Sequence, residues 1–528
     1  MFDQELVLPN ILRRRASEVP DHIFLRTADG KVFTYFQIWE ECKRWAQALA
    51  ALNVSQEDLV AILLPTSPEA FFAWMGSSLL RARQVPINTG YRGAILQHVL
   101  ENSGARLIVT DAVLAERLAR IDLNKTKVEK IVVLSNNPLS LDCPVVGRDA
   151  FFNENCHEVD LKLPHGHDIA SITYTSGTTG ASKGVIVYWS QLYETSRNLL
   201  KHGLSSDDCH YSALPLFHVS GQMPIYLMAL VGGSVVLRSS FSTKEFLPDI
   251  KRFGCTITVV LEAMANFLLS VPENPDDAHI PLRYIMTAPI PANIDHFRKR
   301  FGVSVATAYN MTEIATPLDG GGFVIDGTLP KNYCGRVKPP FECRVVDEND
   351  YEVPHGQFGQ LVVRSTSPWT LNGGYLNDPQ ASAAAWRNGW FHTGDGFIQN
   401  AEGEFFFLCR LKDAIRRRGE NISAQEVEAE ILAHDGVLAA AVIAYPSAHG
   451  EDDVKAYVQL QDGVEFDPVK LIEFLTHRMP HFMVPRYLEV IESMPLTPTN
   501  KIQKQVLRER GNSAGTWDRE AAGIRIAR

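Results

Sequence analysis

The 528-residue sequence lacks a hydrophobic run long enough to cross a membrane. One stretch, from His210 to Arg238, contains no Asp, Glu, Lys or Arg between these two ends, but Pro224 and Gly232–Gly233 interrupt it. Its longest purely apolar piece is Ile225–Val231, whereas a spanning helix needs about 20 apolar residues. The stretch therefore predicts a buried core segment, and we expect no membrane span.

The sequence also lacks closely paired cysteines, and we expect no secretory leader. The eight cysteines form no CxxC motif, and scattered thiols in a chain of this length are typical of reduced proteins. The first residues, Met1–Glu5, carry acidic side chains where a signal peptide has basic ones. These features favour a cytoplasmic protein.

The sequence has no excess of positive charge. Lys and Arg total 51 against 61 Asp and Glu, a formal net charge of −10. This balance argues against binding nucleic acid through overall charge, and we expect no nucleic-acid partner. A length of 528 residues predicts about three or four domains, or one large domain with a smaller one.

The first half of the chain alternates short apolar strands with helices, which is typical of an α/β fold. Strands this short and this continuously apolar suit a parallel sheet that is covered on both faces. The expected strands are 59–64, 84–87, 107–110 and 131–134, and the expected helices are 36–52, 68–80, 95–101 and 112–119.

The pattern of apolar and polar residues changes twice in the second half of the chain. From about Gly335 alternating residues predict a β-rich subdomain, and past Arg410 a mixed pattern of helix and strand follows. We place the main boundary at Leu411/Lys412, which gives domains 1–411 and 412–528. The polar tail after Gly511 is expected to be loosely ordered.

A loop rich in glycine and hydroxyl groups is the sharpest local motif. Residues 175–184 read Thr-Ser-Gly-Thr-Thr-Gly-Ala-Ser-Lys-Gly and follow a strand-like run. Glycines allow close backbone approach, amide groups can form a nest for anions, and Lys183 adds a positive charge. The pattern differs from GxxxxGK[ST], because Lys183 stands three residues after Gly180. It predicts a polyphosphate cradle rather than a flexible surface loop.

This loop resembles the phosphate loop of the adenylate-forming enzymes: acyl-CoA synthetases, peptide-synthetase adenylation domains and luciferases. Further segments resemble motifs of that family in the same order, so that six matches run through almost the whole chain. The further segments are Pro215–His218, Tyr309–Glu313, Trp390–Asp395, Arg410–Asp413 with Gly419–Ser423, and Pro498–Ile502. Leu214–His218, Met479–Tyr487 and Asn500–Lys504 are most similar to the crotonobetaine/carnitine–CoA ligase-like group.

The resemblance implies a fold and a reaction. The fold is an α/β one, with two α/β sheets and a β-rich subdomain in a large N-terminal region and a small, mobile α+β C-terminal domain. The reaction joins a carboxylic acid to ATP, which gives an acyl-adenylate and pyrophosphate, and then to CoA, which gives acyl-CoA and AMP. The substrate would be a carnitine-like or crotonobetaine-like acid, or another short-to-medium acid. ATP, Mg²⁺ and coenzyme A are the implied cofactor and co-substrates, and a homodimer is one expected assembly.

The resemblance also implies a set of catalytic and ATP-binding residues. Glu313 is the expected Mg²⁺ ligand, because Mg²⁺ favours one or two carboxylates plus phosphate oxygens. Thr312 is expected at the α-phosphate, and Asp395 at the ribose hydroxyls. The catalytic set is Lys501, Thr312, Glu313 and Lys183. The ATP-binding set is Thr175, Ser176, Gly177, Thr178, Thr179, Gly180, Lys183, Ala288, Pro289, Tyr309, Asn310, Thr312, Asp395, Arg410 and Lys501.

Acid recognition and the second half-reaction are implied in the same way. The expected acyl pocket contains His218, Val219, Thr287 and Met311. Lys412 is the expected hinge at which the C-terminal domain swings, and Gly419, Glu420 and Asn421 form the expected CoA face.

The sequence departs from the family pattern at three positions and leaves two alternatives open. Asn310, Asn500 and Cys409 each replace a common glycine, and Asn tolerates left-handed backbone geometry better than most residues. His218 stands where amino-acid-activating domains have an Asp, which favours free CoA over a carrier protein as acceptor. The alternatives are a stand-alone adenylation enzyme that loads a carrier protein and a catalytically silent nucleotide-binding regulator.

Overall fold

The structure is a computed structural model. It describes residues 4–136, 139–153, 159–175, 182–200, 202–291, 293–324, 329–411, 415–417, 420–422, 424–447, 452–461, 463–497, 502–524 and 526. Its contacts divide the chain into two compact units. Unit 1 contains Met1–Cys343 and Val363–Phe391, and unit 2 contains Arg344–Val362 and His392–Arg528. The domains expected from the sequence, 1–411 and a mobile 412–528, stay a prediction.

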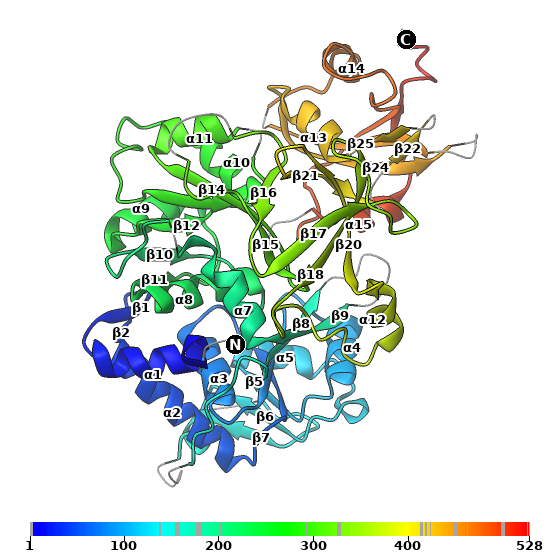
Figure 1. Cartoon of the computed structure of the whole chain (residues 1–528). Coiled ribbons are helices and arrows are strands. Elements are labelled where there is room, and N and C mark those ends of the chain that lie inside the picture. Colours follow the sequence, from blue (N-terminus) through cyan, green and yellow to red (C-terminus); the bar gives the residue numbers. More distant parts are fainter. Residues whose placement is uncertain are drawn as a thin grey trace. The chain divides into compact units, whose positions relative to one another are not determined.

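The first sheet of unit 1 has seven strands in the order β7-β6-β5-β3-β4-β8-β9. All neighbours are parallel except the hairpin of β8 and β9. Helix α3 packs on one face, and α4 and α5 pack on the other (Figure 1). The strands are β3 (Leu59–Leu63), β4 (Arg83–Pro86), β5 (Leu107–Thr110), β6 (Lys130–Val133), β7 (Val145–Gly147), β8 (Ile169–Thr175) and β9 (Lys183–Tyr188). The helices are α3 (Pro68–Ser78), α4 (Gly93–Ser103), α5 (Ala112–Leu118) and α6 (Arg148–Phe151). The predicted alternation of strand and helix is confirmed.

The second sheet of unit 1 has a parallel centre. Within this unit the order is β16-β15-β14-β13-β12-β10-β11-β1-β2, and β14 through β1 are parallel. The strands are β1 (Ile23–Thr27), β2 (Val32–Thr34), β10 (Cys209–Ser212), β11 (Ser234–Leu237), β12 (Ile257–Val259), β13 (Tyr284–Thr287), β14 (Ser304–Met311), β15 (Ala315–Asp319) and β16 (Tyr333–Val337). The remaining elements of the unit are α1 (Leu8–Glu18), α2 (Tyr35–Ala51), α7 (Trp189–Ser196), α8 (Val219–Val231), α9 (Thr243–Phe253), α10 (Glu262–Ser270), α11 (Ile294–Phe301), α12 (Pro379–Ala385) and β19 (Trp386–Arg387).

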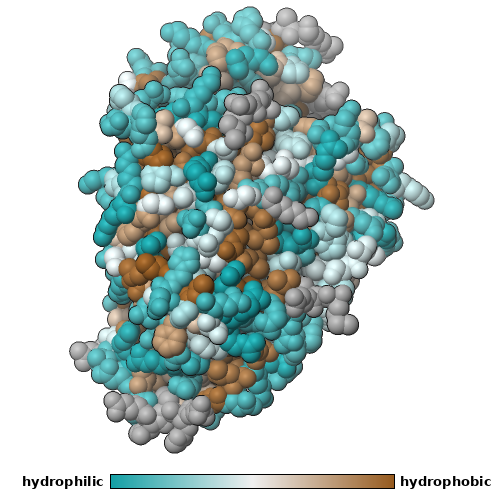
Figure 2. Space-filling view, turned by 60° about the vertical axis from the view of Figure 1, so that its left-hand side comes forward, coloured by the Kyte–Doolittle hydropathy of each residue, from teal (hydrophilic) through white to brown (hydrophobic). Residues whose placement is uncertain are grey.

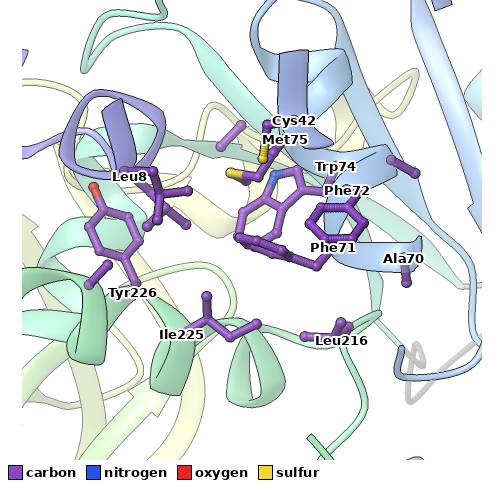
Figure 3. Close-up of a cluster of buried hydrophobic side chains, with 14 of the residues drawn as sticks. Leu8, Cys42, Ala70, Phe71, Phe72, Trp74, Met75, Leu216, Ile225 and Tyr226 are labelled. Carbon is purple, nitrogen blue, oxygen red and sulfur yellow. The ribbon is translucent and has the colours of Figure 1, made fainter. Parts of the chain in front are cut away.

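One continuous hydrophobic core joins the two sheets of unit 1. It gathers side chains from α1, α2, α3 and α8 (Figure 3). At its centre the Trp74 ring stacks on the Trp189 ring, with centroids 5.7 Å apart and an interplanar angle of 3°. Helix α8 is buried along most of its length, as predicted for the uncharged stretch.

Among the described residues, no helix is both long and apolar enough to cross a membrane. The face drawn in Figure 2 is mostly hydrophilic, with hydrophobic residues in separate groups.

Unit 2 contains a four-stranded sheet with helices beside it. The sheet order is β24-β25-β26-β27. Its elements are α13 (Ala424–Leu432), β24 (Val437–Pro446), β25 (Asp452–Leu460), α14 (Pro468–Thr476), β26 (Tyr487–Val490), α15 (Lys504–Arg510) and β27 (Trp517–Asp518). Three further strands each begin in one unit and end in the other: β17 (Phe341–Val346), β18 (Phe358–Ser365) and β20 (Trp390–Gln399). The remaining strands are β21 (Glu404–Arg410), β22 (Ile415–Arg417) and β23 (Glu420–Ile422).

The expectation of a loosely ordered tail after Gly511 is wrong for the residues that the structure describes there. The Lys455 ammonium and the Glu489 carboxylate form a fully buried ion pair of 2.8 Å. The ammonium also donates to Asn512 Oδ1, at 3.0 Å, and Thr516 donates to Glu489. A buried charge pair is stable only when its remaining hydrogen-bonding capacity is filled, and the polar tail fills it.

Candidate active site

Three of the predicted segments follow parallel strands of the same sheet. The loop that contains His218 follows β10, Thr287–Pro289 ends and follows β13, and Tyr309–Glu313 ends and follows β14. Carboxyl ends of parallel strands meet at one edge of a sheet, which is where α/β proteins bind ligands. The fold thus brings residues from the ATP-binding and acyl-pocket predictions to one edge of unit 1.

His218 begins helix α8. Its Nδ1 accepts the backbone N–H of Ser220 at 3.2 Å and lies 2.8 Å from the Ser220 hydroxyl, so the half-buried ring caps the helix. Gly221 keeps the loop close to the helix, because a Cβ there would collide with the carbonyl oxygen of Pro215. The next residue, Val219, is buried. The predicted acyl-pocket role of His218 and Val219 stays a prediction.

The segment after β13 is held by its own backbone. Thr287 is fully buried, and its hydroxyl donates to the carbonyl oxygen of Pro289 at 3.1 Å. Ala288 is half-buried and Pro289 is exposed. Ala288 and Pro289 are thus more accessible to a ligand at this edge than the Thr287 hydroxyl, and the predicted acyl-pocket role of Thr287 stays a prediction.

The exposure of the side chains alternates along the end of β14 and the turn that follows it. Tyr309 is buried, and its hydroxyl lies 3.1 Å from Met311 Sδ, whereas Asn310 is exposed. Thr312 and Glu313 are buried again. The side-chain amide of Gln191, on α7, donates to the Thr312 carbonyl oxygen at 2.7 Å and anchors this turn.

A segment of five residues, Asn372–Leu376, connects this turn to the first sheet; we call it the strap. Along one side it pairs with β9: Gly373 N donates to Ile186 O at 2.9 Å, and Leu376 N donates to Gly184 O at 2.7 Å. On the other side the backbone and side-chain amides of Asn372 donate to Glu313 O, at 3.0 and 2.8 Å. Gly373 is required here, because a Cβ would collide with the Tyr188 hydroxyl.

Tyr375 of the strap contacts two of the predicted catalytic residues. Its hydroxyl donates to Glu313 Oε1 at 3.3 Å. Its ring lies beneath the Lys183 ammonium, with 5.1 Å from Nζ to the ring centroid, which is within the range of a cation–π interaction. The structure therefore brings Lys183 to the ring face of one tyrosine and Glu313 to its hydroxyl.

The donors at this point fit Mg²⁺ held with a nucleotide. Among the residues that the structure describes, no three His, Cys, Asp or Glu side chains gather as a metal cage. Mg²⁺ commonly takes one or two carboxylates and completes its shell with water and phosphate oxygens. A carboxylate has about four lone-pair positions, so a bond from Tyr375 to Glu313 is compatible with metal binding.

Asp395 and Arg410 form a second group, within unit 2. They face each other in the pairing of β20 and β21, with 2.9 Å between Arg410 Nε and Asp395 Oδ1. Asp395 is almost fully buried, while the Arg410 side chain is 42% exposed. The Thr393 hydroxyl donates to Leu361 O at 2.7 Å and accepts the Asp395 N–H at 3.1 Å, which orders the turn.

Part of the predicted site lies outside the described residues. These positions are Ser176, Gly177, Thr178, Thr179, Gly180, Lys412, Gly419 and Lys501. Glu420 and Asn421 belong to β23, of which the backbone alone is described. Thr175 ends β8 and pairs with Lys183 at the start of β9, so both ends of the predicted phosphate loop are described and lie side by side.

Three residues of this arrangement were not predicted from the sequence: Gln191, Asn372 and Tyr375. Gln191 carries no local signal. The sequence Asn-Gly-Gly-Tyr at 372–375 does carry one, because two glycines between an amide and an aromatic residue indicate close backbone approach.

Comparison with known proteins identifies the family. A model of the AMP-binding enzyme family matches residues 12–376, and a model of the AMP-binding enzyme C-terminal domain matches residues 426–501. The chain belongs to the AMP-binding enzyme family. The predicted resemblance to the adenylate-forming enzymes and the predicted fold class are confirmed.

Similar proteins are CoA ligases of nearly the same length. A crotonobetaine/carnitine–CoA ligase from Citrobacter koseri is 29% identical over 505 residues, 92% of this chain and 95% of that protein. O-succinylbenzoate coenzyme A synthetase from Bacillus subtilis, in complex with ATP and magnesium, has 25% identity and a TM-score of 0.79, covering 94% of this chain and 99% of that one. ATP-bound MatB from Rhodopseudomonas palustris has 25% identity and a TM-score of 0.82, covering 95% and 98%. This AMP-binding enzyme is an acid–CoA ligase of the adenylate-forming kind.

Proposed function

We propose that this AMP-binding enzyme activates a small carboxylic acid with ATP and Mg²⁺ and transfers it to CoA, with carnitine and crotonobetaine as the first candidate acids. The catalytic part of this proposal is supported by the contacts that Tyr375 makes with both Lys183 and Glu313. A cation and a carboxylate held on one tyrosine suit a triphosphate, whose charge must be neutralised at several oxygens.

In the first half-reaction the acid's carboxylate attacks the α-phosphorus of ATP, and pyrophosphate leaves. Both reactants are anions, so this chain's residues act mainly by positioning and charge neutralisation. Lys183 binds phosphate oxygens, and the Thr312 hydroxyl donates to the α-phosphate. Glu313 holds Mg²⁺, which when bound neutralises charge on the phosphates. Lys501 bridges the acid's carboxylate and the α-phosphate.

The nucleoside of ATP is bound by residues that differ in burial. Tyr309 and Ala288 with Pro289 contact the adenine, and Asn310, which is exposed, borders it. Asp395 accepts hydrogen bonds from the ribose hydroxyls, and its ion pair with Arg410 orients the carboxylate.

In the second half-reaction the CoA thiol attacks the acyl-adenylate, and AMP leaves. The C-terminal domain turns at Lys412, so that Gly419, Glu420 and Asn421 replace Lys501 over the acid. His218, Val219, Thr287 and Met311 bind the acyl group.

Three further features of the enzyme belong to this proposal: a cytoplasmic location, a homodimeric assembly and binding of a betaine-type acid. The described cysteines are all free thiols, which supports the location. Relatives bearing the name crotonobetaine/carnitine–CoA ligase support the acid. Light scattering coupled to size exclusion tests the dimer.

Pyrophosphate release is the experiment that tests the function. The purified enzyme is incubated with Mg·ATP and a panel of short, branched, aromatic and betaine-type acids. We expect release with a small acid, and formation of its CoA thioester, seen by mass spectrometry, after CoA is added. Transfer to a pantetheinylated carrier protein but not to CoA would contradict the ligase. Absence of pyrophosphate exchange with every acid would favour a silent regulator.

A further inference from the structure

Tyr375 occupies a place in the site to which neither the family comparison nor the motifs assign a role. It is half-buried on the strap, 62 positions along the chain from Glu313 and on a different element from Lys183. Two polar contacts from one side chain to two charged groups exceed what packing alone requires. The strap backbone already holds the Glu313 main chain through Asn372, so the Tyr375 hydroxyl acts on the carboxylate separately.

We propose that Tyr375 is a positioning residue for adenylation, which orients the Glu313 carboxylate for the metal and places the Lys183 ammonium for the phosphates. This inference rests on the proposed function, because it takes Glu313 as the metal ligand and Lys183 as the phosphate-binding cation.

The hydroxyl and the ring of Tyr375 have separable roles. The hydroxyl donates to Glu313 Oε1, and a carboxylate that is held at one oxygen presents the remaining lone pairs in a fixed direction. The ring attracts the Lys183 ammonium through its negative face, which limits where this flexible side chain can extend. Removal of the hydroxyl alone should therefore affect the metal, and removal of the ring should affect the nucleotide as well.

The strap supports both roles by fixing the Tyr375 backbone. Tyr375 N donates to the Ser382 hydroxyl at 2.8 Å, and the neighbouring Gly374 carbonyl accepts the Ile186 N–H at 3.1 Å. The tyrosine is thus anchored to α12 and to β9, the strand that begins with Lys183. A backbone anchored on both sides leaves the side chain few other positions.

Metal binding is the first measurement. Mn²⁺ is titrated into the full-length enzyme with a non-hydrolysable ATP analogue, and free Mn²⁺ is read by electron paramagnetic resonance. Tyr375→Phe keeps the ring and should weaken Mn²⁺ binding about tenfold, the lower range for one hydrogen bond to a charged group. Unchanged or tighter Mn²⁺ binding by Tyr375→Phe would overturn the proposal, because a hydroxyl that merely competes with the metal would have that effect.

Nucleotide binding separates the ring from the hydroxyl. Tyr375→Leu should raise the KM for ATP in pyrophosphate exchange about fivefold above that of Tyr375→Phe, since it alone loses the cation–π contact. Equal KM values for the two variants would remove the Lys183 part of the proposal. Circular dichroism and thermal unfolding establish that each variant is folded.

A matched control removes a structural tyrosine hydroxyl from the same unit. The Tyr226 hydroxyl donates to Leu6 O at 2.6 Å, within the core of Figure 3. Tyr226→Phe should lower the melting temperature and leave Mn²⁺ binding unchanged. An equal loss of Mn²⁺ affinity in this control would show that Tyr375→Phe acts through stability, which would overturn the positioning role.

Glu313→Gln distinguishes failure of this inference from failure of the proposed function. If Glu313→Gln binds Mn²⁺ as the wild type does, Glu313 is not the ligand, and the proposed metal site fails along with this inference. If Glu313→Gln loses Mn²⁺ and Tyr375→Phe does not, only the inference fails. The double variant should be no weaker than Glu313→Gln alone, because the two residues act through one contact.

Discussion

At the scale of single residues, the buried histidine of β10 shows how much an environment changes one side chain. His210 is almost fully buried, and desolvation lowers its pKa to about 3, because burial disfavours the charged ring. Between about pH 3 and pH 6.5 the imidazole is therefore neutral in the folded protein, although the unfolded chain would protonate it.

This burial predicts a pH dependence of stability. A pKa depressed on folding means that the unfolded chain binds one more proton between pH 3 and 6.5, so the stabilisation is complete above pH 6.5 and decreases as pH falls. From pH 7.5 to pH 5.0 this histidine should lower the free energy of unfolding by about 2 kcal/mol. Urea titrations of wild type and His210→Leu at both pH values should show a difference of this size.

An exposed histidine provides the control for that titration. The side chain of His279 is 80% exposed, and His279→Gln should leave the pH dependence as in the wild type. If His210→Leu retains the full loss of stability at pH 5.0, the loss comes from other groups and the prediction is wrong.

The sequence indicated several residues of the site, for particular reasons. Lys183, Glu313 and Asp395 each stand in a motif whose residue types have a direct chemical purpose, so they could be named before the fold was known. Tyr375 could not, because a tyrosine is usually explained by packing and its contact with Glu313 spans 62 positions. A sequence motif indicates the chemistry of residues that are close along the chain. The contact between Tyr375 and Glu313 exists only after both sheets have formed.

At the scale of elements, helix α8 and the loop before it depend on one glycine. Helix α8 begins with the His218 cap, and Gly221 lies in its first turn against the Leu214 and Pro215 carbonyls. There is no room for a side chain, since real Cβ atoms do not approach backbone oxygens so closely.

Gly221→Ala should therefore displace the loop that precedes α8. We expect a loss of about 1–3 kcal/mol in the free energy of unfolding, as for other overpacked sites, and at least a fivefold rise in the KM for the acid. Urea unfolding and steady-state kinetics with saturating ATP measure the two effects. The second effect follows only if His218 and Val219 line the acyl pocket.

Gly203→Ala is the comparison for this substitution. Gly203, unlike Gly221, has a positive φ, of 79°, and a Cβ there would meet no atom within 4 Å. Its replacement should cost about 1–2 kcal/mol for left-handed geometry and leave the KM for the acid unchanged. A wild-type KM in Gly221→Ala would argue against the predicted acyl pocket.

The positions of the strands were easier to predict from the sequence than the pairing of one strand with another. The strands 59–64, 84–87, 107–110 and 131–134 are short apolar runs between helices, and the structure has β3, β4, β5 and β6 within one residue of them. The pairing of β1 with β11 joins segments about 200 positions apart. Neither strand has a feature that selects the other, so this pairing could not be derived from the sequence.

At the scale of the whole molecule, the two half-reactions require different groups over one acid. In the proposed mechanism Lys501 serves adenylation, and a turn at Lys412 exchanges it for the face of Gly419, Glu420 and Asn421. The catalytic lysine and the Lys183–Tyr375–Glu313 group therefore belong to different parts of the chain, and their roles can be separated by experiment.

Lys501→Ala should lose adenylation and retain thioester formation. We expect pyrophosphate exchange to fall at least 100-fold, because the variant lacks the cation that bridges the two anions. Formation of acyl-CoA from chemically prepared acyl-adenylate should stay within about threefold of wild type. Lys470→Ala, which removes a lysine that is 77% exposed, should change neither step. An equal loss of both steps in Lys501→Ala would contradict the domain swing.

The strap has a consequence for how this enzyme could be re-engineered. Because Asn372–Leu376 is hydrogen-bonded to β9 on one side and to Glu313 on the other, Lys183 at the start of β9 and the Glu313 carboxylate are connected through one segment. Helix α8, which begins at the predicted acyl-pocket residues His218 and Val219, is a separate element from the strap, so exchanging it with that of a relative tests the acid specificity on its own. A graft into another enzyme must therefore transfer Glu313 and the strap together. Transferred without the strap, the Glu313 carboxylate would lose the contacts that orient it.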